Sequence, residues 1–165
     1  MIIITSGLPG SGKTYFASSL AKQLGALYLG SDQLRADQNA LGQYSLKDKL
    51  SIYLAMADQT AKAVENSQNV VVDATFYHHT MRNLFIELAL MHHTPLYVIL
   101  VEADEDLIRD RLSKPRQLSE ADLGVYQSMK AQFEKMDIPH LILHSERDNI
   151  TQMLPSAKDY IFNKS

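Results

Sequence analysis

The octapeptide at residues 7–14 constrains this chain most. It reads Gly-Leu-Pro-Gly-Ser-Gly-Lys-Thr and fills the pattern G-x-x-x-x-G-K-[ST] without a gap. A β-branched run, 1–5, precedes it, and Phe16, Leu20 and Leu24 follow it at helical spacing. A strand, a Gly-rich turn and a helix in this order begin an α/β unit, so the octapeptide predicts a parallel sheet covered by helices.

The same octapeptide predicts a binding site for nucleotide phosphates. Its glycines permit positive φ angles, so successive backbone N–H groups can converge on phosphate oxygens at the N-terminus of a helix. The residues expected to contact ATP are Gly7, Pro9, Gly10, Ser11, Gly12, Lys13 and Thr14. Among them, we expect Lys13 to bridge the β- and γ-phosphates as a catalytic residue and Thr14 to place its hydroxyl on Mg²⁺.

Strand-length apolar runs alternate with helical periodicity along the rest of the chain. The expected strands are 1–5, 26–29, 70–72, 96–101 and 140–144, and the later helices are about 46–65, 80–92, 104–112, 119 onward and 150–161. This alternation predicts a P-loop NTPase fold, a three-layer α/β/α sandwich with a five-stranded parallel sheet like that of nucleotide kinases. We expect one domain over residues 1–165, with a short lid at about 113–119.

Two aspartates end predicted strands, where open parallel sheets bind ligands. Asp73 follows three valines and is expected to hold Mg²⁺ with Thr14, although a cap or turn role is the alternative. Asp32 is a candidate general base, because an acceptor hydroxyl becomes a good nucleophile when a carboxylate takes its proton. Arg35, one turn later, is suited to an anionic group on the acceptor. From spacing alone, an N-cap role for Ser31 or Asp32 beside a surface arginine is equally consistent.

Composition narrows the classes of protein that remain. Lys and Arg number 16 against 19 acidic residues, with a net charge of −3, so an extended nucleic-acid footprint is not expected. A nucleic-acid 5′ end or a small molecule remains open as the hydroxyl-bearing partner. The chain has no cysteine, no apolar run near 18 residues and an N-terminal run too short for a signal peptide. We therefore expect a cytoplasmic protein without a membrane partner.

Four blocks of the chain resemble, in order, the P-loop kinases related to polynucleotide 5′-kinases, a group often described only as AAA-type ATP-binding proteins. The blocks are GLPGSGKT (7–14), SDQLR (31–35), VVVDATF (70–76) and DLIRDRLSKPRQLSEADLGVYQSMKAQFE (106–134). The resemblance implies that Asp32 is the general base, that Arg35 contacts the acceptor's phosphate and that Asp73 lines the site. It also implies a lid arginine over ATP, for which Arg111 and Arg116 are the candidates.

These features predict an ATP- and Mg²⁺-dependent kinase that moves the γ-phosphate to a hydroxyl acceptor in the manner of polynucleotide kinases. One alternative keeps the chemistry but uses a small molecule, such as a metabolite, nucleoside, sugar acid or antibiotic. Another is a non-catalytic NTP-binding switch or scaffold. Both alternatives share the phosphate-binding loop, so the loop by itself does not separate them.

Several other side chains are given lesser roles. The adjacent pairs 78–79 and 92–93 are not expected to bind zinc, because neighbours do not share a helix face and no carboxylate stands at ligand spacing. His78, His79 and Arg82 are candidates for the border of the acceptor pocket. The tyrosines expected to be core or rim residues are Tyr44, Tyr53, Tyr77 and Tyr126.

Overall fold

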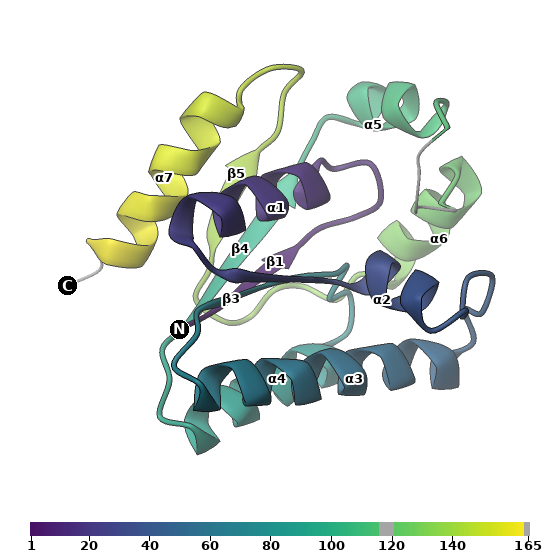
Figure 1. Cartoon of the computed structure of the whole chain (residues 1–165). Helices are drawn as coiled ribbons and strands as arrows, with labels where there is room; N and C mark the ends of the chain where they lie inside the picture. Colours follow the sequence, from purple (N-terminus) through teal and green to yellow (C-terminus); the bar gives the residue numbers. More distant parts are fainter. Residues whose placement is uncertain (116–120, 164–165) are drawn as a thin grey trace.

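The computed structural model describes residues 1–115 and 121–163, which form one five-stranded parallel sheet with helices around it (Figure 1). The strands are β1 (Ile2–Ser6), β2 (Leu27–Gly30), β3 (Val70–Asp73), β4 (Leu96–Glu102) and β5 (Leu141–His144). The helices are α1 (Lys13–Leu24), α2 (Ser31–Asp37), α3 (Leu46–Glu65), α4 (His79–Met91), α5 (Glu105–Leu112), α6 (Leu123–Gln132) and α7 (Ile150–Phe162). The strand order is β2-β3-β1-β4-β5, so the predicted α/β fold with five parallel strands is confirmed.

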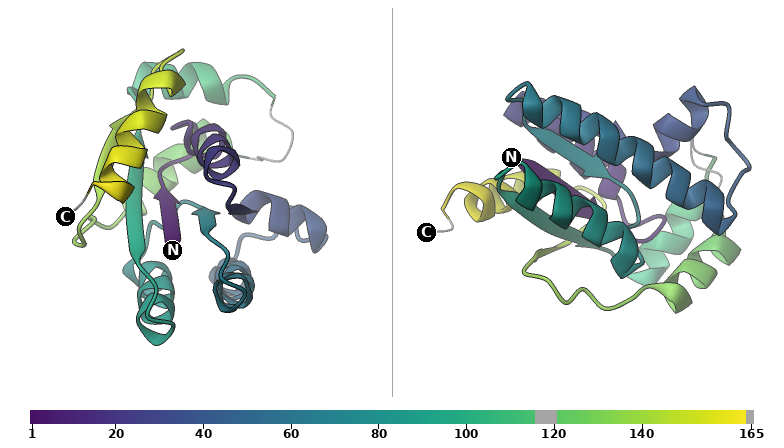
Figure 2. Two further views of the ribbon diagram at one scale, coloured as in Figure 1. Left: turned by 60° about the vertical axis from the view of Figure 1, so that its left-hand side comes forward. Right: turned by 90° about the horizontal axis from the view of Figure 1, so that it is seen from below.

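Helices cover both faces of the sheet and make the three predicted layers. Helices α1 and α7 lie over one face, and α3 and α4 lie over the other (Figures 1 and 2). Side chains alternate across β1, so Ile3 packs with α1 and α7 while Ile2 and Ile4 pack with α3 and α4. All three are fully buried, as expected for a central parallel strand with helices on both sides.

Strand register brings the predicted site residues to one edge of the sheet. Asp73, the last residue of β3, pairs with Thr5 of β1 on one side and with Gly30 of β2 on the other. The octapeptide follows β1 directly and α2 follows β2 directly, so both leave the sheet beside Asp73. Helices α2, α5 and α6 lie beyond this edge (Figure 1).

Two helix starts differ from the expectations. The helix expected from residue 119 is α6, in which the Asp122 carboxylate accepts a 2.9 Å hydrogen bond from the Val125 N–H. Asp122 is therefore the N-cap, and the helix begins at Leu123, later than expected, because Ser119 and Asp122 are both residue types that cap helices. The N-cap of α2 is Gly30, so the capping role considered for Ser31 or Asp32 is wrong.

Part of the expected lid, residues 116–119, lies outside the described residues, and 113–115 follow the end of α5. Within the two described ranges, no helix combines the length and apolar character that a bilayer crossing requires.

Candidate functional site

The loop between β1 and α1 has a backbone that only glycine allows at key positions. Gly12, the N-cap of α1, has φ 90° and ψ 6°, a left-handed conformation that strains residues with a Cβ. A Cβ on Gly7 would stand 2.5 Å from the carbonyl oxygen of Val101 in β4. Because Gly12 has no side chain to cap α1, the first N–H groups of this helix remain suited to an anion.

Arg111 of α5 contacts the backbone of this loop. Its guanidinium donates to the Gly10 carbonyl oxygen at 3.1 Å, to Ser145 Oγ at 3.0 Å and to the Glu146 carbonyl oxygen at 2.9 Å. A cavity of about 890 Å³, the flanking cavity, lies between Arg111, the start of α1 and residues 145–150. Arg111 thus borders a space next to the loop, as the predicted contact with ATP requires.

Asp73 lies at the centre of the candidate site and is 3% exposed. Burial raises the pKa of its carboxyl group, while the Lys13 ammonium and the hydroxyl groups of Tyr28 and Thr14 act in the opposite direction. Within the described part of the chain, Asp73 Oδ1 has no hydrogen-bond partner by distance and angle. A buried carboxylate oxygen without a donor, close to a threonine hydroxyl, fits the oxygen ligands that Mg²⁺ prefers.

Tyr28 is a site residue that the sequence reasoning missed. Its hydroxyl donates to Asp73 Oδ2 at 2.7 Å, and burial followed by the charge of Asp73 raises the pKa of Tyr28. Gly30 makes this contact possible, because a Cβ at position 30 would stand 2.5 Å from the Tyr28 hydroxyl oxygen. The sequence signal that could have indicated this contact is the spacing of Tyr28 and Gly30, two residues apart at the end of β2.

Asp32 and Arg35 share one side of α2. Arg35 Nη1 lies 3.3 Å from Asp32 Oδ1, and the Asp32 side chain is 39% exposed whereas that of Arg35 is 8% exposed. The arginine predicted at the surface in the alternative interpretation is therefore buried. Its Cζ lies 5.0 Å from the centre of the Tyr44 ring, so the guanidinium packs on an aromatic face.

A cavity of about 880 Å³, the central cavity, brings these groups together. The sequence-predicted residues in its wall are Pro9, Lys13, Thr14, Asp32, Arg35 and Asp73. Gly10 and Gly12 border the flanking cavity with Arg111, while Ser11 is buried and Gly7 packs on β4. Arg116 lies outside the described residues. The wall also contains Lys49 of α3, which the sequence reasoning did not select.

The side chains proposed for the border of the acceptor pocket do not line either cavity. Arg82 is 2% exposed and donates to the carbonyl oxygens of Phe76, Lys135 and Glu134, at 2.8, 2.9 and 2.6 Å. These bonds hold the segment after α6 against the start of α4. The role of Arg82 in the described structure is therefore to support the fold.

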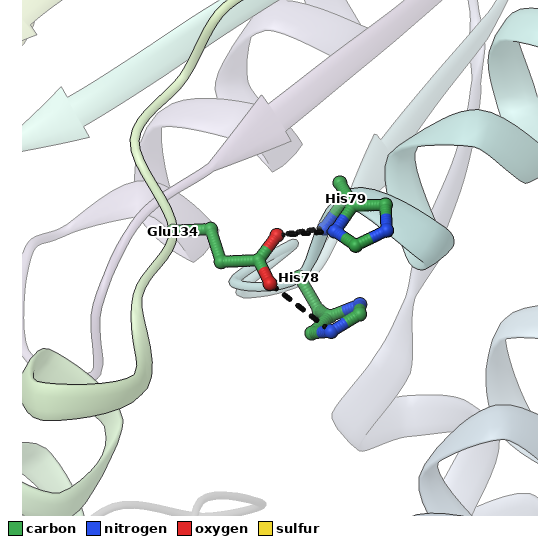
Figure 3. A group of neighbouring side chains, drawn as sticks. All are labelled: His78, His79 and Glu134. Atoms are coloured by element: carbon green, nitrogen blue, oxygen red, sulfur yellow. Dashed lines mark hydrogen bonds and ion pairs between the residues drawn. The ribbon is translucent and has the colours of Figure 1, made fainter.

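Glu134 meets His78 and His79 at the N-terminus of α4, and both imidazoles point to its carboxylate (Figure 3). His78 Nε2 and His79 Nδ1 lie 3.1 and 2.6 Å from its oxygens, and the His79 backbone N–H donates to it at 2.8 Å. The sequence has no carboxylate at ligand spacing from these histidines, but the fold brings Glu134, 55 residues from His79 along the chain, into contact with both imidazoles. Candidate metal-ligand atoms lie within 4.8 Å of one another here.

Electrostatics favour a capping role for this cluster over a cation site. The positive end of a helix disfavours a cation and stabilises a carboxylate. The backbone N–H and then the imidazole of His79 lower the pKa of Glu134. His78 Nδ1 accepts a 3.1 Å hydrogen bond from the Thr80 N–H, so its Nε2 carries the proton directed at Glu134. The histidine nitrogens and the carboxylate therefore already satisfy one another.

Known proteins share this fold over nearly the whole chain. A sugar kinase from Janibacter sp. HTCC2649 matches with a TM-score of 0.75 at 17% identity, covering 97% of this chain and 93% of that one. The APS kinase of Mycobacterium tuberculosis, in complex with AMPPNP and APS, matches with a TM-score of 0.74 at 19% identity, covering 97% and 96%. A gluconokinase from Sinorhizobium meliloti 1021 matches with a TM-score of 0.70 at 14% identity, covering 99% and 97%.

At these identities the matches establish the fold alone, a P-loop kinase-like arrangement around the 7–14 loop. A family model also matches this chain in sequence, over residues 2–136. The matched region includes the 7–14 loop, Asp32, Asp73 and Arg111. On this match, the chain belongs to the AAA domain family, with a P-loop kinase-like fold.

Proposed function

We propose that this protein is an ATP- and Mg²⁺-dependent kinase that transfers the γ-phosphate to a hydroxyl group of a small molecule. One observation carries the proposal: Lys13 and Thr14 of the loop share the wall of the central cavity with Asp32. A phosphoryl donor and a hydroxyl acceptor can therefore meet in one space, with a carboxylate beside them. The proteins of the same fold include ones named sugar kinase, gluconokinase and APS kinase, which supports a small acceptor.

In the proposed reaction, the loop N–H groups and Lys13 hold the β- and γ-phosphates. The Asp32 carboxylate takes the proton of the acceptor hydroxyl, whose oxygen forms a bond to the γ-phosphorus as the bond to the β-phosphate oxygen breaks. ADP leaves, and the proton remains on Asp32 until solvent removes it. Thr14 and Asp73 would hold Mg²⁺, which neutralises phosphate charge when bound.

Cavity size and charge favour a small acceptor over a nucleic-acid end. The central cavity of about 880 Å³ is in the range of small-molecule pockets. The chain has a net charge of −3, which opposes extended binding along a phosphate backbone. A lid arginine also belongs to the proposal: Arg111 borders the flanking cavity, and Arg116 is the second candidate.

Asp32→Asn tests the proposal. We expect kcat for phosphate transfer to fall by roughly 10²–10⁴, with ATP affinity nearly constant, because a neutral amide cannot accept the proton. Asp37→Asn is the matched control, since Asp37 is exposed on the same helix and bonds only Gln33 among the hydrogen bonds described for it. Labelled ATP would be offered with small hydroxyl compounds and with 5′-hydroxyl oligonucleotides.

Each outcome has a defined meaning. Full turnover by Asp32→Asn would remove Asp32 from the chemistry. Transfer of label to the oligonucleotide in preference to every small hydroxyl compound would show that the acceptor is a nucleic-acid 5′ end. Nucleotide binding with no transfer to any acceptor would favour the switch or scaffold.

A further inference from the structure

Tyr53 of α3 belongs both to the hydrophobic core and to the wall of the central cavity. The residue is 3% exposed, and its ring packs edge-on against that of Phe76, with 5.1 Å between the ring centres. The hydroxyl group of a buried tyrosine usually has a hydrogen-bond partner. The contacts of this hydroxyl group therefore determine what Tyr53 can do at the cavity.

The hydroxyl group of Tyr53 is used in one direction. Its oxygen accepts a 2.8 Å hydrogen bond from the backbone N–H of Phe76. Among the residues that the structure describes, no atom accepts the proton of this hydroxyl group. Tyr28 in the same wall differs, because its hydroxyl donates to Asp73. A hydroxyl group is both a donor and an acceptor, so Tyr53 retains one unused donor.

The surroundings of the Tyr53 hydroxyl indicate that this donor faces the cavity. Burial raises the pKa of Tyr53, while the Phe76 N–H and the charge of Arg35 act in the opposite direction, and Tyr77 and Asp73 raise it further. Arg35, Tyr77 and Asp73 all line the central cavity, so the hydroxyl group lies within electrostatic reach of its wall. Because the pKa is raised, Tyr53 keeps its proton at neutral pH and can donate it in a hydrogen bond.

The position of this donor is fixed relative to the phosphate-binding loop. Phe76 has φ 52°, a left-handed conformation that is strained for a residue with a Cβ. Tyr53 holds its N–H, and Arg82 Nε donates to its carbonyl oxygen at 2.8 Å. One residue earlier, the Thr75 carbonyl oxygen accepts a 2.7 Å hydrogen bond from Ser6 Oγ, directly before the loop. The donor is therefore pre-organised, which lowers the entropy cost of binding a ligand.

An unused donor at a cavity makes a site selective. A site that hydrogen-bonds a substrate oxygen discriminates against the analogue without that oxygen, because the donor is then left unpaired. The reacting hydroxyl is not a suitable partner, since a hydrogen bond donated to the attacking oxygen withdraws electron density from it and opposes the action of Asp32. The γ-phosphate already has Lys13 and the loop. A second oxygen of the acceptor is the remaining partner for Tyr53.

We propose that the Tyr53 hydroxyl is a specificity-determining donor to the acceptor, which carries a second oxygen, of a hydroxyl or carbonyl group, apart from its reacting hydroxyl. The inference rests on the proposed kinase function and adds the substrate class. Sugars and the ribose of nucleosides belong to this class, and simple alcohols with one hydroxyl do not.

Acceptors that differ by one oxygen test the donor. Ribose, glucose and adenosine would each be compared with singly deoxygenated forms that keep the phosphorylated hydroxyl. In the wild type, we expect loss of the contacted oxygen to lower kcat/KM roughly tenfold to 10³-fold, because the Tyr53 hydroxyl is left without a partner. In Tyr53→Phe, the parent and the deoxygenated compound should differ by less than about threefold, because the interaction is absent with both.

Phe85→Leu is the control for an altered core. Tyr53→Phe also removes the acceptor of the Phe76 N–H, so it changes packing as well as the cavity. The ring of Phe85 packs against Phe76 at 5.3 Å between ring centres and does not line the cavity. Phe85→Leu should lower the urea midpoint and keep the wild-type ratio of parent to deoxygenated acceptor. The comparison within the wild type requires no variant, so it tests the donor even if Tyr53→Phe does not fold.

Binding to the loaded protein separates the donor from the kinase reaction. Protein saturated with Mg²⁺ and AMPPNP, so that the loop is filled, would be titrated with the same pairs of compounds in a calorimeter. We expect the wild type to bind the parent more tightly than the form without the contacted oxygen. Tyr53→Phe should bind the two forms with similar affinity.

The two hypotheses fail in different ways. A wild-type protein that phosphorylates every deoxygenated form as well as its parent would overturn the donor role of Tyr53 and leave the kinase standing. A Tyr53→Phe variant that keeps the wild-type ratio would overturn the donor role as well. Tyr53-dependent discrimination in binding, without transfer to any acceptor, would support the donor and overturn the kinase. Absence of both transfer and discrimination would overturn both.

Discussion

Asp73→Asn should stabilise the nucleotide-free protein while weakening its response to Mg²⁺ and ATP. The Asp73 carboxylate is buried, and its Oδ1 has no partner within the described residues. An unsatisfied buried polar group costs about 1–3 kcal/mol, more when it is charged. Asparagine is nearly isosteric, and its amide oxygen can still accept from the Tyr28 hydroxyl. We expect the variant to gain about 1–2 kcal/mol, or roughly 2–8 °C in Tm for a chain of this size.

The gain should depend on pH with a defined sign. Folding raises the pKa of Asp73 above its ordinary value of 3.8, so the native state keeps the proton to higher pH than the unfolded state does. The free energy of unfolding of the wild type therefore falls as pH rises from the unfolded pKa to the higher folded pKa. Asparagine does not titrate, so the advantage of Asp73→Asn should grow through this range and then level off.

Nucleotide should reverse the order of stabilities. A ligand at 100 times its Kd stabilises the native state by about 2.7 kcal/mol, and the variant would lose much of this gain with its metal ligand. Urea denaturation at several pH values, with and without Mg²⁺ and ATP, measures both effects. Asp58→Asn is the control, because the Asp58 side chain is 63% exposed. A nucleotide-free Asp73→Asn protein less stable than the wild type at neutral pH would refute the reasoning.

Two further changes test the supports of the site. Gly30→Ala places a methyl group 2.5 Å from the Tyr28 hydroxyl oxygen and should break its hydrogen bond to Asp73. We expect this variant, and Tyr28→Phe, to lose about 1–2 kcal/mol of unfolding free energy in urea denaturation. Wild-type stability in both variants would contradict this. Arg82→Met leaves three backbone carbonyl oxygens without their donor and should cost about 3 kcal/mol or more of unfolding free energy in the same assay. Arg109→Met, at the surface, should change stability by less than about 0.5 kcal/mol. Equal effects of the two arginine changes would refute the structural role of Arg82.

Local patterns were sufficient for the architecture. The apolar spacing of 46–65 predicted α3 with the bounds that the structure has, because a helix of 20 residues repeats its 3.6-residue period many times. The three valines before Asp73 predicted a buried strand, and the octapeptide predicted the turn before α1. The start of α6 was harder to predict, because Ser119 and Asp122 are both residue types that cap helices and stand three positions apart.

The contacts that define the site join residues far apart in the sequence. Tyr28 meets Asp73 across 45 residues, and Glu134 meets His79 across 55. Lys49 lies on a helix of ordinary amphipathic pattern, and nothing in its neighbours along the chain marks it as a wall of the central cavity.

The sequence alone determined that this chain forms a phosphate-binding loop at the edge of a parallel sheet with Asp32 and Asp73 at strand ends, because those features depend on residues within one turn or strand. The tertiary structure decided which side chains complete the site. Strand register placed Tyr28 beside Asp73, and the packing of α2 and α3 placed Arg35 beside Lys49. Register and helix packing arise from burial across the whole sheet, so no local pattern encodes them.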